Sequence, residues 1–106
     1  MLNGEFEKLL VDAVHESLSS LGESPKQAIL FHLENTFNIK KQEIPSKVAS
    51  FDEALRKLFG PGADFLENLI VKKLCEKAGS AFKGSPPQET SFTETIASIK
   101  RALVKL

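Results

Sequence analysis

Apolar side chains recur every three or four residues along almost the whole chain, and no segment alternates apolar and polar residues. A repeat near 3.6 residues is typical of a helix with one buried face, whereas a half-buried strand needs a repeat of two. The last stretch shows the pattern most clearly, with apolar residues spaced four, three, four and three apart: Phe92, Ile96, Ile99, Leu103 and Leu106. The spacing predicts an all-α fold, a compact bundle of four core helices with a linked C-terminal helix.

Two helices are predicted in the first 38 residues. The first spans residues 5–21 and ends at Gly22, because glycine readily adopts the left-handed conformation that closes a helix. Ser24 followed by Pro25 is a helix cap followed by a proline at the first helical position, so the second helix is predicted to begin there. This helix should end near Asn38, since asparagine tolerates a left-handed backbone.

Two further core helices follow an irregular connector. The sequence SFDE at residues 50–53 has the pattern of a capping box and is predicted to open the third helix, which Gly60 ends. The fourth helix spans Ala63–Ala78, and its apolar face shifts from the side of Phe65 to the side of Cys75. Two apolar sides require two sets of neighbours, so this helix is expected at the centre of the domain.

Composition divides the chain into three parts. Residues 1–79 hold the four core helices, and residues 80–91, with two prolines and a glycine, are predicted to be a linker. A second capping box at residues 91–94 opens an amphipathic helix over residues 92–106. An isolated helix of this length is marginal in water, so its apolar seam must pack either on its own domain or on another chain. The sequence leaves both positions open.

The charges balance overall but are unevenly distributed. The chain of 106 residues has 14 basic and 14 acidic side chains, which disfavours a dedicated nucleic-acid binder. Residues 1–53 carry a net charge of −4 (5 basic, 9 acidic), and residues 54–106 carry +4 (9 basic, 5 acidic). Such a separation could orient self-association or a partner, or it could be an uneven distribution on solvated helix faces.

Several classes of protein are disfavoured by what the sequence lacks. Cys75 is the single cysteine, so an internal disulfide and a thiolate zinc site are excluded. No apolar run approaches the roughly 20 residues of a membrane span, and the N-terminus does not resemble a signal peptide. We therefore expect a cytoplasmic protein without a cofactor or a bound metal.

The sequence Gly60-Pro61-Gly62 raises the question of a phosphate-binding loop. A nucleotide loop follows a strand and offers several free backbone N–H groups, whereas this turn follows a helix and contains a proline. The helix that follows begins with Asp64 and Glu67, and their charges would repel phosphate or a DNA groove. The turn is therefore interpreted as a structural corner between two helices.

No pattern of residues indicates catalysis. His15 and His32 are the two histidines, and neither has an acidic residue at the spacing of a known helical metal pair. Cys75 lies among apolar residues without a neighbouring base, which favours a small buried side chain over a nucleophile. The protein is therefore predicted not to be an enzyme.

The strongest functional signals are apolar residues without an obvious place in the core. Phe31 points away from the apolar face of its own helix, so it either packs on a second neighbour or marks a binding surface. The candidate partner-binding residues are Phe31, Phe92, Ile96, Ile99, Leu103 and Leu106. They suggest a non-catalytic protein–protein interaction module, with homodimerisation through residues 92–106 as one form of it. The alternative is a nucleic-acid-binding domain with a basic face at residues 72–77 and 100–105: Lys72, Lys73, Lys77, Lys100, Arg101 and Lys105.

Residues 13–79 also resemble a known family. The likeness rests on SLGES at residues 20–24, HLE at 32–34, the dipeptide IP at 44–45, ALRKLFG at 54–60 and KKL at 72–74. With these motifs the chain resembles the thaumarchaeal response-regulator output domains of the NitrOD type. The resemblance implies a small all-helical domain of archaeal signalling proteins and supplies no catalytic residues. The chain has no receiver domain of its own, so a link to phosphorelay signalling does not follow from it.

Overall fold

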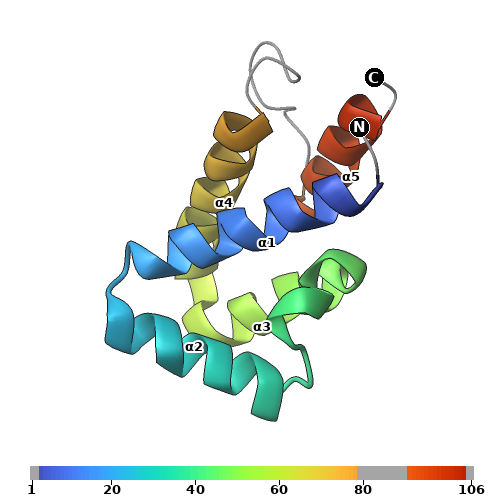
Figure 1. The fold of residues 1–106 in the computed structure, drawn as a ribbon. Helices are drawn as coiled ribbons and strands as arrows, with labels where there is room; N and C mark the ends of the chain where they lie inside the picture. The colour runs from blue at the N-terminus through green and yellow to red at the C-terminus, as the bar shows by residue number, and fades with distance from the viewer. Residues whose placement is uncertain (1–2, 79–90, 105–106) are drawn as a thin grey trace.

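The computed structural model describes residues 3–78 and 91–104, and it confirms the all-α prediction (Figure 1). No strand occurs in these residues, and none of their helices is long and apolar enough to cross a membrane. The elements in chain order are α1 (Asn3–Ser19), α2 (Glu23–Asn35), the 3₁₀ helix η1 (Lys41–Ser46), α3 (Val48–Phe59), the 3₁₀ turn η2 (Gly60–Gly62), α4 (Ala63–Ala78) and α5 (Phe92–Val104).

Helices α1 and α4 form the centre of the domain. They pack closely on each other, and both also contact α5, while α3 packs on α4 and α2 packs on α1 (Figure 1). The central position expected for α4 is therefore confirmed, and α1 shares it. The two helices are held together by fully buried apolar side chains, of which Leu10 and Val14 of α1 and Ile70 and Leu74 of α4 are 0% exposed.

The start of α2 differs from the predicted one. The helix begins at Glu23 with Gly22 as its cap, because the carbonyl of Gly22 accepts a hydrogen bond from the Lys26 N–H. Ser24 and Pro25 therefore lie inside the first turn, where proline's missing N–H needs no helical partner. Gly22 has φ 113°, a conformation that favours glycine. Asn38 has φ 57° and confirms the expected left-handed residue, three positions after the helix ends.

The start of α3 also differs from the prediction. The helix begins at Val48, two residues before the SFDE pattern, and the carbonyl of Lys47 accepts the hydrogen bond from the Phe51 N–H. Ser50 is therefore a residue of the first turn and does not cap the helix. Because the helix begins earlier than predicted, Asp52 does not lie at its start. The Asp52 carboxylate pairs with Arg56, one turn further along the same helix.

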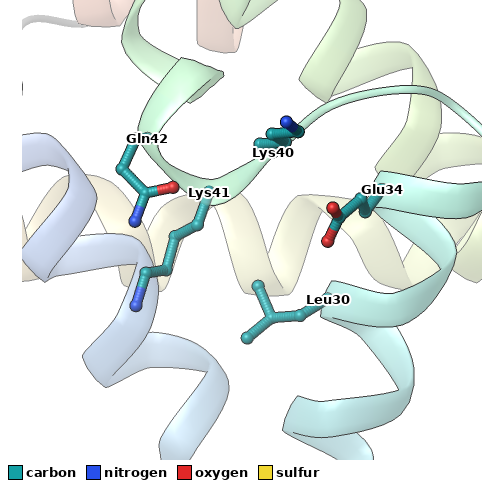
Figure 2. A pocket seen from close by; sticks show the side chains of 5 residues that line it. All are labelled: Leu30, Glu34, Lys40, Lys41 and Gln42. Carbon is teal, nitrogen blue, oxygen red and sulfur yellow. The ribbon is translucent and has the colours of Figure 1, made fainter.

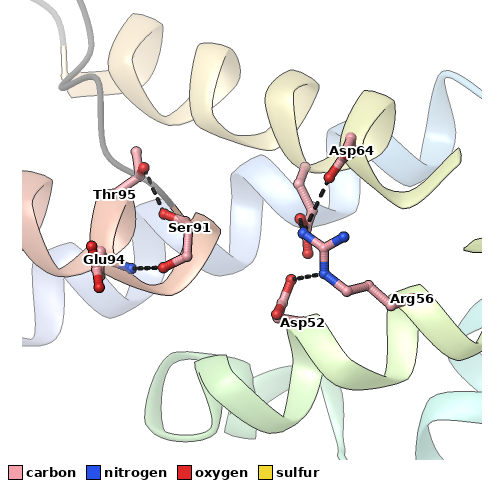
Figure 3. Close-up of polar contacts among 7 residues, drawn as sticks. Asp52, Arg56, Asp64, Ser91, Glu94 and Thr95 are labelled. Atoms are coloured by element: carbon pink, nitrogen blue, oxygen red, sulfur yellow. Dashed lines mark hydrogen bonds and ion pairs between the residues drawn. The ribbon is translucent and has the colours of Figure 1, made fainter. Parts of the chain in front are cut away.

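The C-terminal helix packs on its own chain. Its first turn is capped as predicted, since the Ser91 hydroxyl accepts a hydrogen bond from the Glu94 N–H at 3.1 Å (Figure 3). Its buried residues fill the space beside α1, α3 and α4, and they are Phe92, Ile96, Ile99 and Leu103. The sequence left open whether α5 packs on its own domain or on another chain, and in the structure it packs on its own domain. Residues 80–90 of the predicted linker (80–91) and Leu106 lie outside the described residues.

Candidate interaction surface

The turn between α3 and α4 exposes two phenylalanines. Helix α3 ends at Phe59 because Gly60 adopts φ 57° and ψ −132°, and α4 begins three residues later at Ala63. Within this short segment Phe59 is 36% exposed and Phe65 is 71% exposed. Phe65 is the most exposed large apolar side chain in the described part of the chain. We call residues 59–65 the apolar corner.

Phe65 points outward because α4 has one buried face. The residues of that face are Ala63, Leu66, Glu67, Ile70, Leu74 and Ala78. Successive residues of a helix are about 100° apart, which places Phe65 on the far side of the helix from Ile70 and Leu74. The prediction that the apolar face of α4 begins on the side of Phe65 was therefore wrong. Ala63 and Glu67 lie on the buried face at the start of the helix instead.

Phe31 is exposed, so of the two roles that the sequence left open it does not take the one of packing against a second element of the core. Its side chain is 60% exposed, and its ring meets that of His32 edge to face with 5.7 Å between the ring centres. Helix α2 instead buries Ile29 and Leu33. The structure therefore leaves Phe31 accessible to a partner, and its role in binding stays a prediction.

The other candidate partner-binding residues that the structure describes are not accessible. Phe92 is 7% exposed and its ring centre lies 6.2 Å from that of Phe51 in α3. Ile96, Ile99 and Leu103 are equally enclosed by the domain's own helices. A partner cannot contact these side chains while α5 occupies this position, so the accessible apolar surface lies elsewhere.

Beside the apolar corner, one arginine contacts three acidic residues (Figure 3). Arg56 projects from α3, and its Nε donates to Asp52 Oδ1 at 3.1 Å. Its Nη2 donates to Asp64 Oδ1 at 3.1 Å and to Glu67 Oε1 at 3.2 Å. These bonds tie α3 to α4 directly beneath the turn. One guanidinium offsets one negative charge, so ionised carboxylates would leave this acidic cluster with a net negative charge.

Glu67 is the one buried carboxylate of the acidic cluster. It is 3% exposed, and its Oε2 is buried without a hydrogen-bond partner among the described residues. Burial, followed by the neighbouring carboxyl group of Asp52, raises the pKa of Glu67 to about 8, although the charge of Arg56 acts in the opposite direction. From the sequence, Glu67 was considered only as a charged residue at the start of a helix, where it would repel phosphate. Its position four residues after Ala63 and three before Ile70 was the signal of a buried place.

The basic residues proposed as a nucleic-acid surface are partly neutralised within the chain. Lys77 pairs with Glu16 of α1, and Lys100 lies 3.4 Å from Glu7 of the same helix. The hydrogen bond between the first pair lowers the pKa of Glu16 and raises that of Lys77. The acidic first half of the chain is thus joined to the basic second half by bonds inside the domain. Lys105 lies outside the described residues.

A small hollow lies between the end of α2 and η1 (Figure 2). Its volume is about 200 Å³, and its lining consists of Leu30, Glu34, Lys40, Lys41 and Gln42. Sites for small organic ligands usually enclose about 300–1,000 Å³ and are mostly apolar. The hollow is smaller and is lined by side chains of both charges, so it does not have the character of a ligand pocket.

Cys75, the residue considered as a nucleophile, has the features of an unreactive thiol. Cys75 is half-buried, and desolvation raises the pKa of its thiol, which disfavours the reactive thiolate. His32 is exposed on α2 beside Phe31. Across residues 3–78 and 91–104, no group of three His, Cys, Asp or Glu side chains is placed to hold a metal ion.

No protein-family model, curated protein or solved structure matches this chain. The properties of the apolar corner therefore follow from the exposure and the charge of its own residues. An apolar corner with a negatively charged edge can bind another protein by burying Phe65 and pairing Asp64 with a basic side chain. Asp64 suits this role because its side chain is 67% exposed.

Proposed function

We propose that this domain is a non-catalytic protein–protein interaction module that binds its partner through the apolar corner. The proposal is carried by the exposure of Phe65, a large aromatic side chain at 71%. Burying a phenylalanine contributes about 1.5–3 kcal/mol. Phe6 and Phe51 are almost completely buried, so their burial already stabilises the fold. Phe65 is not buried in the domain, so burying it against a partner would stabilise the complex.

The chemistry of the corner indicates what the partner should offer. Phe65 directly follows Asp64, which is exposed and belongs to the acidic cluster around Arg56. A complementary surface would be apolar at its centre, to cover Phe65 and Phe59, with lysine or arginine at its edge. Complementary charges of this kind govern the choice of partner and the rate of association. A second copy of this chain is one such partner, since it carries an excess of basic residues in its second half.

The resemblance to NitrOD-type output domains supports a narrower form of the proposal. In that form the interaction belongs to a signalling protein, and the module passes a signal to a downstream protein. The resemblance lies within residues 13–79, which include the whole of the apolar corner. The narrower proposal fails if the protein bound at the corner has no part in signalling.

The test is site-specific photo-crosslinking in the organism that makes the protein. A photoreactive phenylalanine analogue replaces Phe65 in one variant and Glu76 in the control. Glu76 is exposed on the same side of α4, three turns away from Phe65. We expect a discrete crosslinked protein from position 65 that is absent from position 76.

The crosslinked protein is then purified and its affinity is measured against the wild type and the Phe65→Ser variant. At least a tenfold weaker affinity of the variant supports the proposal. Identical crosslinks from both positions, or equal affinities, would contradict it. A crosslink to a second copy of the chain would identify the module as a homodimer.

A further inference from the structure

The buried carboxylate of Glu67 lacks a partner on one side. Its Oε1 accepts a hydrogen bond from Arg56, but its Oε2 is enclosed and meets no donor among the described residues. Leaving a buried acceptor without a donor is unfavourable, and the cost is greater for a charged oxygen than for a neutral one. The position of Oε2 therefore opposes ionisation of Glu67.

The neighbours of Glu67 add to this effect. The groups that act most strongly on it are Asp52 and Arg56 from α3 and Asp64 from its own helix. Arg56 is shared by all three acids, and its Nε is already used by Asp52. Two carboxylates side by side cannot both ionise without repulsion, and one guanidinium divided among three acids does not cancel it.

We infer that Asp52 and Glu67 together form a proton-binding site, which holds one proton between the two carboxyl groups at neutral pH and so joins α3 to α4. With the proton bound, Glu67 can donate an O–H to Asp52, and its Oε1 still accepts from Arg56. The orphaned oxygen then has a hydrogen bond, and the cluster has lost one negative charge. The pKa of about 8 for Glu67, well above its ordinary value of 4.5, agrees with this geometry.

The site links proton binding to the stability of the domain. Because the folded protein holds the proton more tightly than the unfolded chain, the stabilisation is fully present below pH 4.5 and declines as the pH rises through about 8. Above that pH the ionised pair repels across the contact of α3 with α4. The site therefore makes this contact sensitive to pH between about 4.5 and 8, and the inference does not depend on any partner bound at the corner.

The direct test follows the carboxyl carbon of Glu67 by ¹³C NMR between pH 4 and pH 10. We expect its titration midpoint near pH 8, whereas a midpoint near 4.5 would overturn the inference. In the variant Asp52→Asn the new amide can donate to Oε2 and the neighbouring negative charge is removed, so the midpoint should fall below that of the wild type. The control Glu53→Gln removes an exposed acid from the neighbouring position of α3 and should leave the midpoint unchanged. A fall of equal size in both variants would contradict the assignment to Asp52.

A second measurement uses the neutral analogue Glu67→Gln. Urea unfolding at pH 6 and pH 9 should show a loss of stability for the wild type over this interval and a clearly smaller loss for the variant. An equal loss in both proteins would show that another group is responsible and would overturn the inference. If the variant does not fold, the NMR midpoints of the wild type and Asp52→Asn decide the question.

Discussion

The ammonium of Lys100 in α5 lies 3.4 Å from the carboxylate of Glu7 in α1. The same ammonium lies 5.8 Å from the centre of the Phe6 ring, within the range of a cation–π contact. Lys100 thus makes two contacts that join α5 to α1. Together with the pair formed by Lys77 and Glu16, it explains how the two oppositely charged halves of the chain can belong to one compact domain.

These pairs lead to a prediction about nucleic acids. Because Lys77 and Lys100 already face carboxylates of α1, part of the charge of the basic face is compensated within the domain, which weakens phosphate binding. We expect no retardation of duplex DNA or of single-stranded RNA in gels at 50 mM salt. A retarded band that disappears in the variant Lys72→Ala, or that weakens steeply with salt, would restore the alternative function.

The packing of α5 predicts a large effect for a substitution that the sequence left open. Ile99 is 0% exposed, and Ile99→Ala should destabilise the domain by about 2–5 kcal/mol through lost burial and a residual cavity. Ala102 is exposed on the same helix, so Ala102→Ser should change the free energy of unfolding by less than about 0.5 kcal/mol. Urea unfolding followed by circular dichroism measures both. A small effect at Ile99 would mean that α5 is not part of the core in solution.

The two capping boxes read from the sequence should respond differently to the same change. Ser91→Ala removes the hydroxyl that accepts the Glu94 N–H and should cost about 1 kcal/mol. Ser50→Ala should be neutral or slightly stabilising, because Ser50 lies inside α3 and alanine is the better helix former. Thermal unfolding of both variants provides the comparison, and equal losses would place the start of α3 at Ser50 after all.

The glycines of the turn before α4 should also differ from each other. Gly60 has φ 57° and ψ −132°, which an L-residue rarely adopts, so Gly60→Ala should destabilise the protein by more than about 1 kcal/mol. A Cβ at Gly62 would meet the Cβ of Phe59 at 3.7 Å, an ordinary contact, so Gly62→Ala should be tolerated. Differential scanning calorimetry can rank the two, and a reversed order would contradict the described turn.

The exposed and buried phenylalanines give a prediction that separates folding from binding. Phe65→Ser should change the free energy of unfolding by less than about 0.5 kcal/mol, because the side chain makes little use of the core. Phe51→Ala should cost about 3–5 kcal/mol, since Phe51 is 0% exposed. Chemical denaturation measures both variants. A strongly destabilised Phe65→Ser would mean that the apolar corner is required for folding.

The fold class and the range of α4 could be predicted from the sequence, because helical periodicity and the glycines that end helices are local signals. The starts of α2 and α3 could not, since the backbone carbonyls of Gly22 and Lys47 accepted the first helical bonds ahead of the more recognisable Ser24 and Ser50. Local patterns do not show which of two adjacent candidates caps a helix. That choice depends on how the preceding segment approaches.

The candidate site was harder to predict, because it depends on which side of each helix is covered. Counting Phe65 as a core residue was reasonable for an aromatic side chain, and counting Glu67 as a surface residue was equally reasonable for an acid. The structure reverses both assignments, because the face of α4 that packs on α1 includes Glu67 and does not include Phe65. The apolar seam of α5 was predicted correctly, but a seam of that length can pack equally well on its own domain or on another chain.

The place of α5 has a consequence for protein synthesis. Its buried side chains fill space bordered by α1, α3 and α4, so the core cannot close until the ribosome has released residues 92–104. Until then the apolar faces of the preceding helices remain exposed, and chaperones bind nascent chains in this state. A stop codon introduced just after residue 90 should therefore yield an insoluble fragment rather than a smaller folded protein.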